Sequence, residues 1–420
     1  MLGRVRRLLI KFLCPAFAMF LTGCTVICPD DDDIGQRQLT VALYPFIPEF
    51  LTAANTIKRE FEAANPRIKL NILDLRSNYY RPDQANYIGK VDADVFELDS
   101  ILLAQFITDK KIRELPADAL LPQAELLKNA YVGTQVDGKR YGAAHWICHY
   151  FLFFSKAAAP ASPIRTLTDL ENYIGQGKDP NRLILDLKGN LTLGEIYLDA
   201  AFDRYSDLSR VLKAVDSMDP DLQDDIIRLL KLCPPGGCRD VVYHEDTGIY
   251  GQLFARKRAK ALIGYSELLH DVISEGQACG DACISDPDLD VSDLPMDDAG
   301  STPVTWVDSF TVNSSCVGEC LADASTFIKF MNQDSTYLQL LLPGSTEFPE
   351  EPTPAPVIPA YLLPAKATLY LNGSLLQHAH LYPRLRALVE NSIVPTADQL
   401  AAKLRLLGSQ LDEKLNEVKY

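Results

Sequence analysis

The chain has 420 residues, of which 47% are hydrophobic and 23% are charged. This composition is typical of a globular protein that is long enough for two or three domains and can bury a large core. The formal net charge of −15 argues against a nucleic-acid partner, because an anionic protein is repelled by a phosphate backbone.

The first 23 residues predict a lipoprotein signal peptide. They carry four cations and no acid, and an apolar stretch from Phe12 to Leu21 that is too short to span a bilayer. The stretch ends in Leu21-Thr22-Gly23-Cys24, which resembles the bacterial lipobox, so we expect export, acylation of Cys24 and anchoring to the cell envelope. A plain signal peptide with a chance cysteine is the alternative. Loss of the signal changes the formal net charge from −15 to −19, which favours cationic ligands.

The next segment, residues 24–37, contains four consecutive aspartates and is predicted to be a solvated, acidic tether. Beyond it, strands and helices alternate. Strands are predicted at Leu39–Phe46, Lys69–Leu75 and Ala93–Asp99, and helices at Leu51–Ala64 and Ile101–Ile112. This alternation is typical of a parallel sheet. An extended, aromatic stretch follows at Tyr141–Phe154.

The rest of the chain predicts a second α/β region. Strands are expected at Leu183–Leu187, Ala261–Tyr265 and Thr302–Val312, and helices at Leu193–Tyr205, Leu208–Met218, Leu222–Leu232, Ile249–Arg258, Leu321–Met331, His378–Val389 and Thr396–Leu415. Thr396 and Gln399 fit a capping box at the start of the last helix.

The order of these elements predicts an α/β protein with the two-lobed class II periplasmic binding-protein fold. One lobe would comprise residues 38–155 and 300–350, and the other residues 156–299 and 351–420 with the C-terminal helices. In this layout a ligand lies in the cleft between the lobes, at the carboxyl ends of strands.

Six of the ten cysteines form close local pairs, namely Cys233 with Cys238, Cys279 with Cys283, and Cys316 with Cys320. An exported protein meets an oxidising compartment, so three disulfides are expected, although six cysteines allow fifteen connectivities. Zinc held by the last four is an alternative, but their three-residue gaps differ from the usual CxxC spacing. Two cysteines beyond the lipobox have no near partner: Cys28 in the tether and Cys148 in the aromatic stretch.

Five segments of the chain resemble the thiaminase I family and follow the order that the family has. They are Tyr44-Pro45-Phe46-Ile47-Pro48, Asp94 to Asp99, Tyr141 to Cys148, Gly264 to Glu267, and Trp306-Val307-Asp308. The resemblance spans most of the mature chain. It implies a transferase that cleaves thiamin at the methylene bridge, through a cysteine adduct on the pyrimidine, and transfers the pyrimidine to a nucleophilic base.

The resemblance also implies a role for individual residues. Cys148 would be the nucleophile and Glu267 its general base. Substrate contacts would come from Tyr44, Phe46, Asp94, Asp99, Tyr265, Trp306 and Asp308. Tyr80 and Tyr250 are weaker candidates for stacking on a flat ring. Phe46 and Trp306 stand where the family has tyrosine, which removes two hydroxyls from the pocket.

These residue types suit such chemistry. A thiol with a pKa of about 8.5 is mostly protonated at neutral pH, and a carboxylate within hydrogen-bond reach can take its proton as attack begins. Acids and aromatic faces together favour a cationic substrate. Simpler explanations exist: a cysteine among aromatics is commonly buried packing, and Asp99 can cap the helix that follows it.

A second hypothesis is a non-catalytic solute-binding lipoprotein that delivers thiamin or a related cation to an ABC importer. The lipobox favours this receptor, whereas the combination of Cys148 with Glu267 favours the enzyme. A receptor for sugars or peptides is a third, weaker hypothesis, since fewer acids would be expected at its strand ends.

No cofactor and no metal site are predicted, and the protein is expected to be a monomer. The acidic loop from Asp286 to Asp298 begins like a calcium loop, but it has Val291 where the sharp turn requires glycine. His145 and His149 are four residues apart in an extended segment, where this spacing does not align them as ligands.

Overall fold

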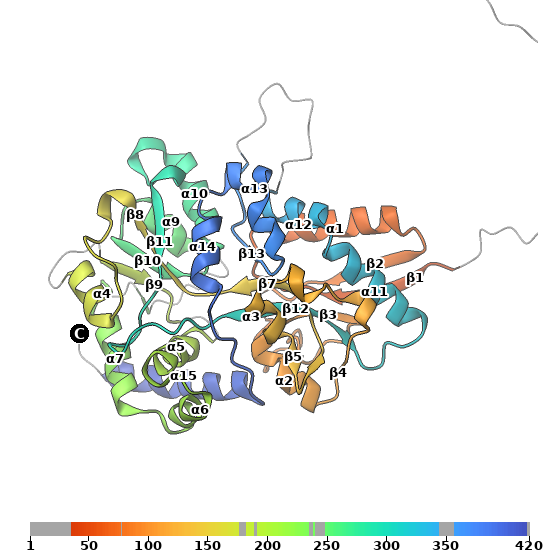
Figure 1. Ribbon diagram of the computed structural model, residues 1–420, viewed down its shortest axis with the longest axis horizontal. Coiled ribbons are helices and arrows are strands. Elements are labelled where there is room, and N and C mark those ends of the chain that lie inside the picture. Colours follow the sequence, from red (N-terminus) through yellow and green to blue (C-terminus); the bar gives the residue numbers. More distant parts are fainter. Residues whose placement is uncertain are drawn as a thin grey trace, which may run out of the picture.

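The computed structural model describes residues 35–76, 78–175, 182–188, 191–234, 238–239, 248–343 and 357–417. The predicted signal peptide, Cys24, Cys28 and most of the predicted tether lie outside this range. Within it, two sheets lie side by side and carry helices on both faces (Figure 1). No helix of the described part is long and apolar enough to cross a membrane.

The larger sheet belongs to the first lobe, and its strands follow the order β13-β7-β12-β3-β1-β2, with β4 also paired to β12. The strands are β1 (Arg37–Ala42), β2 (Ile68–Leu73), β3 (Val95–Asp99), β4 (Ile112–Arg113), β7 (Ala143–Cys148), β12 (Trp306–Asn313) and β13 (Leu363–Pro364). Strands β1, β2 and β3 are parallel, as their alternation with helices predicts. Strand β12 runs antiparallel between β3 and β7.

Helices cover both faces of this sheet. They are α1 (Phe50–Ala64), α2 (Ser100–Thr108), α3 (Lys128–Gly133), α11 (Glu319–Met331), α12 (Asp334–Leu341) and α13 (Gly373–His378). Helix α1 buries Phe50, Ala54, Ile57 and Phe61, which recur at three- and four-residue intervals on one helical face. A small hairpin of β5 (Gln135–Val136) and β6 (Lys139–Arg140) turns at Asp137-Gly138, where both residues have positive φ.

The second sheet has the order β11-β8-β10-β9 and forms the centre of the other lobe. Its strands are β8 (Phe151–Ser155), β9 (Leu183–Leu185), β10 (Ala261–Gly264) and β11 (Leu289–Ser292). The helices of this lobe are α4 (Leu167–Ile174), α5 (Thr192–Tyr205), α6 (Leu208–Ser217), α7 (Pro220–Leu230), α9 (Ile249–Ala255), α10 (Leu268–Cys279), α14 (Tyr382–Val389) and α15 (Leu400–Glu417).

Three of the predicted lobe assignments differ from the structure, since helix α13 was also assigned to the second lobe but covers the first sheet. Strand β8 was assigned to the first lobe but pairs with β10 and β11 in the second sheet, and β13 was assigned to the second lobe but pairs with β7 in the first. Only His149 and Tyr150 separate β7 from β8. Because both strands are apolar, the sequence does not mark where the chain changes sheets.

The start of the last helix also differs from the prediction. Helix α15 begins at Leu400, and Gln399 has a φ of 57°, so Thr396 and Gln399 form no capping box. The helix packs on α5 and α6 and also contacts α2 of the first lobe. It therefore joins the two lobes, along with the crossings at residues 149–150 and 293–305.

Candidate active site

A pocket of about 250 Å³ lies between the two lobes. From the first lobe it is lined by Tyr44, Phe46, Ile47, Pro48, Glu49, Tyr80, Asp99, Cys148 and Trp306. From the second lobe it is lined by Leu191, Thr192, Glu195, Gly248, Tyr265, Glu267, Leu268 and Asp271. Five of these described residues are acids and none is lysine or arginine, so the pocket favours a cationic ligand.

Cys148 ends β7 and is partly exposed to this pocket. Its thiol donates a hydrogen bond to Asp308 Oδ2 over 3.2 Å. Burial raises the pKa of Cys148 well above its usual value, and the neighbouring carboxyls of Asp308, Glu267 and Asp99 raise it further. At neutral pH this residue is therefore a thiol, which needs a base before it can act as a nucleophile.

Asp99 and Asp308 lie directly opposite each other on the antiparallel strands β3 and β12. Asp308 is 1% exposed, and its Oδ1 atom is buried without a hydrogen-bond partner among the described residues. Burial raises its pKa well above the usual value, and the nearby Asp99 and Glu97 add to the effect. An unpaired buried carboxyl oxygen is costly unless a ligand supplies the donor, so Asp308 is suited to contact a substrate.

Asp99 has two roles in the structure. Its Oδ1 caps helix α2 by accepting the Ile101 amide over 2.9 Å, as the simpler explanation predicts, and its Oδ2 accepts the Tyr80 hydroxyl at the pocket wall. Burial raises its pKa to about 6, which the hydrogen bonds partly oppose.

Aromatic rings form the wall beside these acids. Phe46 and Tyr80 are parallel with centroids 5.9 Å apart, and Tyr44 meets Phe46 edge-on at 5.5 Å. The loop that carries Tyr44 is held by Glu97, whose Oε2 accepts the Tyr44 amide over 2.9 Å. The other oxygen of this buried carboxylate contacts His145 Nδ1 at 2.5 Å. Such rings present faces and edges to a flat heterocycle in the pocket.

The structure brings most of the predicted site residues together. Eight of them line the pocket, namely Tyr44, Phe46, Tyr80, Asp99, Cys148, Tyr265, Glu267 and Trp306. Asp308 does not line it but accepts the hydrogen bond from the Cys148 thiol. Asp94 does not belong to this group, because it lies at the opposite end of β3, where its Oδ2 accepts the Thr40 amide over 2.8 Å. Tyr250 lies on α9, is 1% exposed in the core and does not line the pocket.

Three further acids of the pocket were not predicted, namely Glu49, Glu195 and Asp271. Glu49 precedes α1 and follows the predicted Tyr44 to Pro48 loop directly. Glu195 and Asp271 occupy the first turns of α5 and α10, where an acid is also favoured by the helix dipole. No pattern in the sequence separates such an acid from a ligand-binding one.

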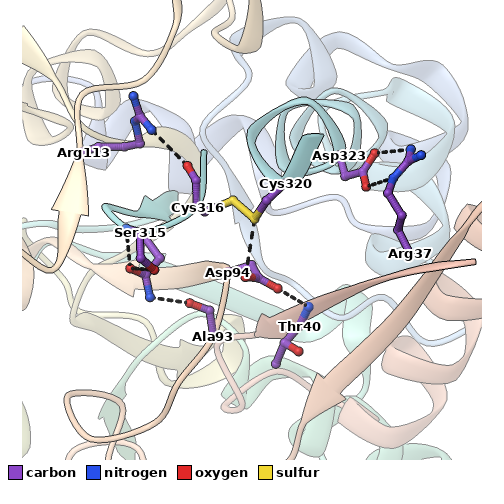
Figure 2. Close-up of a disulfide and its surroundings, with 10 residues drawn as sticks. Arg37, Thr40, Ala93, Asp94, Arg113, Ser315, Cys316, Cys320 and Asp323 are labelled. Atoms are coloured by element: carbon purple, nitrogen blue, oxygen red, sulfur yellow. Dashed lines mark hydrogen bonds and ion pairs between the residues drawn. A yellow bond between two sulfur atoms is a disulfide. The ribbon is translucent and has the colours of Figure 1, made fainter. Parts of the chain in front are cut away.

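The structure joins the three local cysteine pairs as disulfides. Figure 2 shows Cys316 and Cys320 above Asp94 and next to the ion pair of Arg37 and Asp323. None of these residues lines the pocket. These two sulfurs and Asp94 lie within reach of a common ion, but the disulfide occupies the sulfurs. A zinc site made of Cys279, Cys283, Cys316 and Cys320 is inconsistent with these bonds.

The chain is similar to known proteins over most of its length. The Thiaminase-1 of Paenibacillus thiaminolyticus is 25% identical over 366 residues, which cover 84% of this chain and 81% of that protein. This chain resembles thiaminase I over most of its length. The resemblance inferred from the five segments is thus confirmed, although no protein-family model matches the chain.

Solved structures give the same result for the fold. The thiaminase I of Clostridium botulinum, determined in complex with thiamin, superposes with a TM-score of 0.74 at 20% identity, covering 90% of this chain and all of that one. A solute-binding protein of an ABC transporter from Agrobacterium radiobacter, in complex with ribitol, reaches 0.69 at 12% identity, covering 91% and 94%. The predicted two-lobed binding-protein fold is confirmed.

Proposed function

We propose that the protein is a thiaminase I-like transferase that cleaves thiamin at its methylene bridge and transfers the pyrimidine to a nucleophilic base. The observation that carries the proposal is the position of Cys148. Unlike the six described cysteines in disulfides, it has a thiol, and this thiol faces a pocket that also contains Glu267. A receptor has no use for a thiol and a carboxylate in one pocket.

Charge and shape support thiamin as the substrate. The thiazolium ring of thiamin is cationic, and the pocket is lined by five acids. Tyr44, Phe46 and Tyr80 offer ring faces and edges for the flat heterocycles. Oδ1 of Asp308, which has no hydrogen-bond partner among the described residues, would accept a hydrogen bond from the aminopyrimidine.

The proposed reaction has two steps. In the first, Cys148 Sγ forms a bond to the pyrimidine ring as its proton passes to Glu267, and the bond from the methylene to the thiazolium nitrogen then breaks, with its electron pair leaving on the neutral thiazole. In the second, the nucleophilic base bonds to the methylene and the cysteine is expelled, regaining a proton. The raised pKa of Cys148 makes the base necessary, since little thiolate is present beforehand.

The test is mass spectrometry of the protein incubated with thiamin and a nitrogenous base, with Cys148→Ser and Glu267→Gln as variants. We expect free thiazole and a pyrimidine adduct of the base from the wild type and neither product from Cys148→Ser, which should still bind thiamin. Glu267→Gln should keep a slow rate that rises with pH as the thiol ionises unaided. Tight binding of thiamin by the wild type without cleavage by any base would instead support the solute-binding lipoprotein.

We also propose that the protein is exported and anchored to the bacterial cell envelope through Cys24. The lipobox and the cationic, apolar leader support this localisation. Replacing Cys24 by serine should release the protein from membranes, and unchanged membrane association without a lipid would contradict the anchor.

A further inference from the structure

One carboxylate in the second lobe contacts both segments that carry the proposed catalytic residues. Oε2 of Glu195 accepts the Tyr265 hydroxyl over 2.8 Å and the Tyr150 hydroxyl over 3.1 Å. Tyr150 lies two residues after Cys148, and Tyr265 lies two residues before Glu267. Glu195 is therefore linked to each of these residues through one phenol and two peptide units.

The pairing of strands explains why these tyrosines meet. Gly264 of β10 lies opposite Phe151 of β8, so Tyr265 and Tyr150 follow immediately beyond the end of this antiparallel pair. Their rings stack with centroids 4.3 Å apart and planes at 29°. The β8–β10 pair thus ends in two stacked rings, and their hydroxyls converge on a single acceptor.

Glu195 is well placed to hold this arrangement. It lies in the first turn of α5 and is 6% exposed, and α5 is itself fixed by packing against α6, α7 and α15. Burial raises the pKa of Tyr265 well above its usual value, and the Glu195 charge raises it further, so this phenol remains a donor at all physiological pH values. Hydrogen bonds from hydroxyls to a buried carboxylate are stronger than those between neutral groups.

We propose that Glu195 is a positioning residue, which sets the separation of Cys148 and Glu267 by fixing Tyr150 and Tyr265 to one carboxylate oxygen. This inference rests on the proposed function, because it assigns the aligned pair to thiol attack. Displacement of a reacting group by about 1 Å costs about 100-fold in rate, so loss of the shared acceptor reduces turnover more than substrate binding.

The chain offers a matched control on the same helix. Asp203 lies two turns beyond Glu195, is equally buried at 6% exposure, and accepts the backbone amides of Met296 and Thr302. Asp203→Ala therefore removes one buried and one part-buried hydrogen bond of α5, and neither involves the segments of Cys148 and Glu267. Its effect on thermal unfolding measures the purely structural cost of such a loss.

The experiment compares the thiamin turnover of Glu195→Ala, Glu195→Gln and Asp203→Ala. Each rate is divided by the concentration of folded protein. We expect Glu195→Ala to lower kcat about 100-fold and to raise KM by a smaller factor, because the pocket also loses one of its five acids. Glu195→Gln should recover most of kcat, because its carbonyl oxygen still accepts from hydroxyls, and Asp203→Ala should keep wild-type kcat. Wild-type kcat in Glu195→Ala, or an equal fall of kcat in Asp203→Ala, would overturn the proposal.

Amide hydrogen exchange supplies a readout that does not depend on turnover. Glu195→Ala should accelerate exchange in both segments, at residues 148–152 and 264–268, whereas Asp203→Ala should leave both unchanged. If the wild type never cleaves thiamin, the proposed function fails while this measurement still decides the role of Glu195. Unchanged exchange in both segments of Glu195→Ala would overturn that role.

Discussion

Burial gives Asp99 two consequences that oppose each other. The carboxyl is 5% exposed and its pKa is raised to about 6 from the usual 3.8, so at neutral pH it is ionised at a cost to folding. The same ionised carboxylate, beside Asp308 and the aromatic wall, is what attracts a cation. The ionised Asp99 therefore lowers the free energy of unfolding but supplies negative charge to the pocket.

This opposition predicts the behaviour of Asp99→Asn. For a carboxyl with a raised folded-state pKa, the folded state binds the extra proton, so stability is greatest below pH 4 and falls as the pH rises through 6. We expect Asp99→Asn to increase the free energy of unfolding at pH 7 by up to about 3 kcal/mol, and little at pH 4. Urea unfolding at the two pH values measures the difference, and an equal effect at both would contradict it.

The same carboxyl should govern binding. With Cys148→Ser, which prevents turnover, the affinity for thiamin should increase as the pH rises from 5 to 7, because Asp99 then becomes ionised. The double variant Cys148→Ser with Asp99→Asn should bind more weakly at pH 7 and lose most of this pH dependence. Titration calorimetry across the range checks the prediction, and a parallel pH dependence in both variants would refute it.

At the scale of elements, the crossings between the lobes are joined by His149. Its Nδ1 donates to the Val304 carbonyl over 2.6 Å, so the β7–β8 crossing is tied to the β11–β12 crossing. Val304 in turn forms a parallel bridge with Ile393, in the segment that leads to α15. Burial lowers the pKa of His149 to about 4, so the imidazole is neutral at physiological pH.

A neutral buried imidazole makes stability depend on pH in the opposite direction to Asp99. The folded-state pKa of His149 lies below the usual 6.5, so its neutral form contributes fully to the free energy of unfolding above pH 6.5. About 3 kcal/mol of this free energy is lost as the pH falls towards 4. His149→Asn keeps a donor for Val304 but cannot be protonated. We expect this variant to be less sensitive to acid between pH 6.5 and 4 in thermal unfolding, and equal sensitivity would count against the assignment.

The sequence predicts these elements better than their connections. Periodic apolar residues and turn signals locate α1, α5, α6 and β10 closely, since local patterns determine them. Strand β12 was predicted to begin at Thr302 but begins at Trp306. The sequence does not predict the change of sheet between β7 and β8 or the start of α15. Both depend on which distant strand or helix the segment packs against. At the site, the family resemblance points to Cys148, Glu267 and Asp308. The proposed role of Glu195 depends instead on Tyr150 and Tyr265, which are distant from it in sequence.

Across the molecule, the distribution of charge attracts a cationic ligand to the pocket. The chain carries a formal net charge of −15, and the described lining of the pocket has five acids without a lysine or arginine. A cleft of one charge between low-dielectric walls concentrates the field and accelerates association of the opposite charge. Salt screens such long-range attraction, with a Debye length of about 10 Å at 0.1 M.

We therefore expect the association rate of thiamin with Cys148→Ser to fall about tenfold as salt is raised from low to high concentration. Dissociation should change much less, because contacts with Asp99 and the aromatic wall act at short range, where ions do not enter. Stopped-flow fluorescence separates the two rates, and a neutral pyrimidine without the thiazolium serves as the control, with an association rate that salt leaves nearly constant. Equal salt dependence for the neutral compound, or none for thiamin, would show that the acids of the pocket do not steer the substrate.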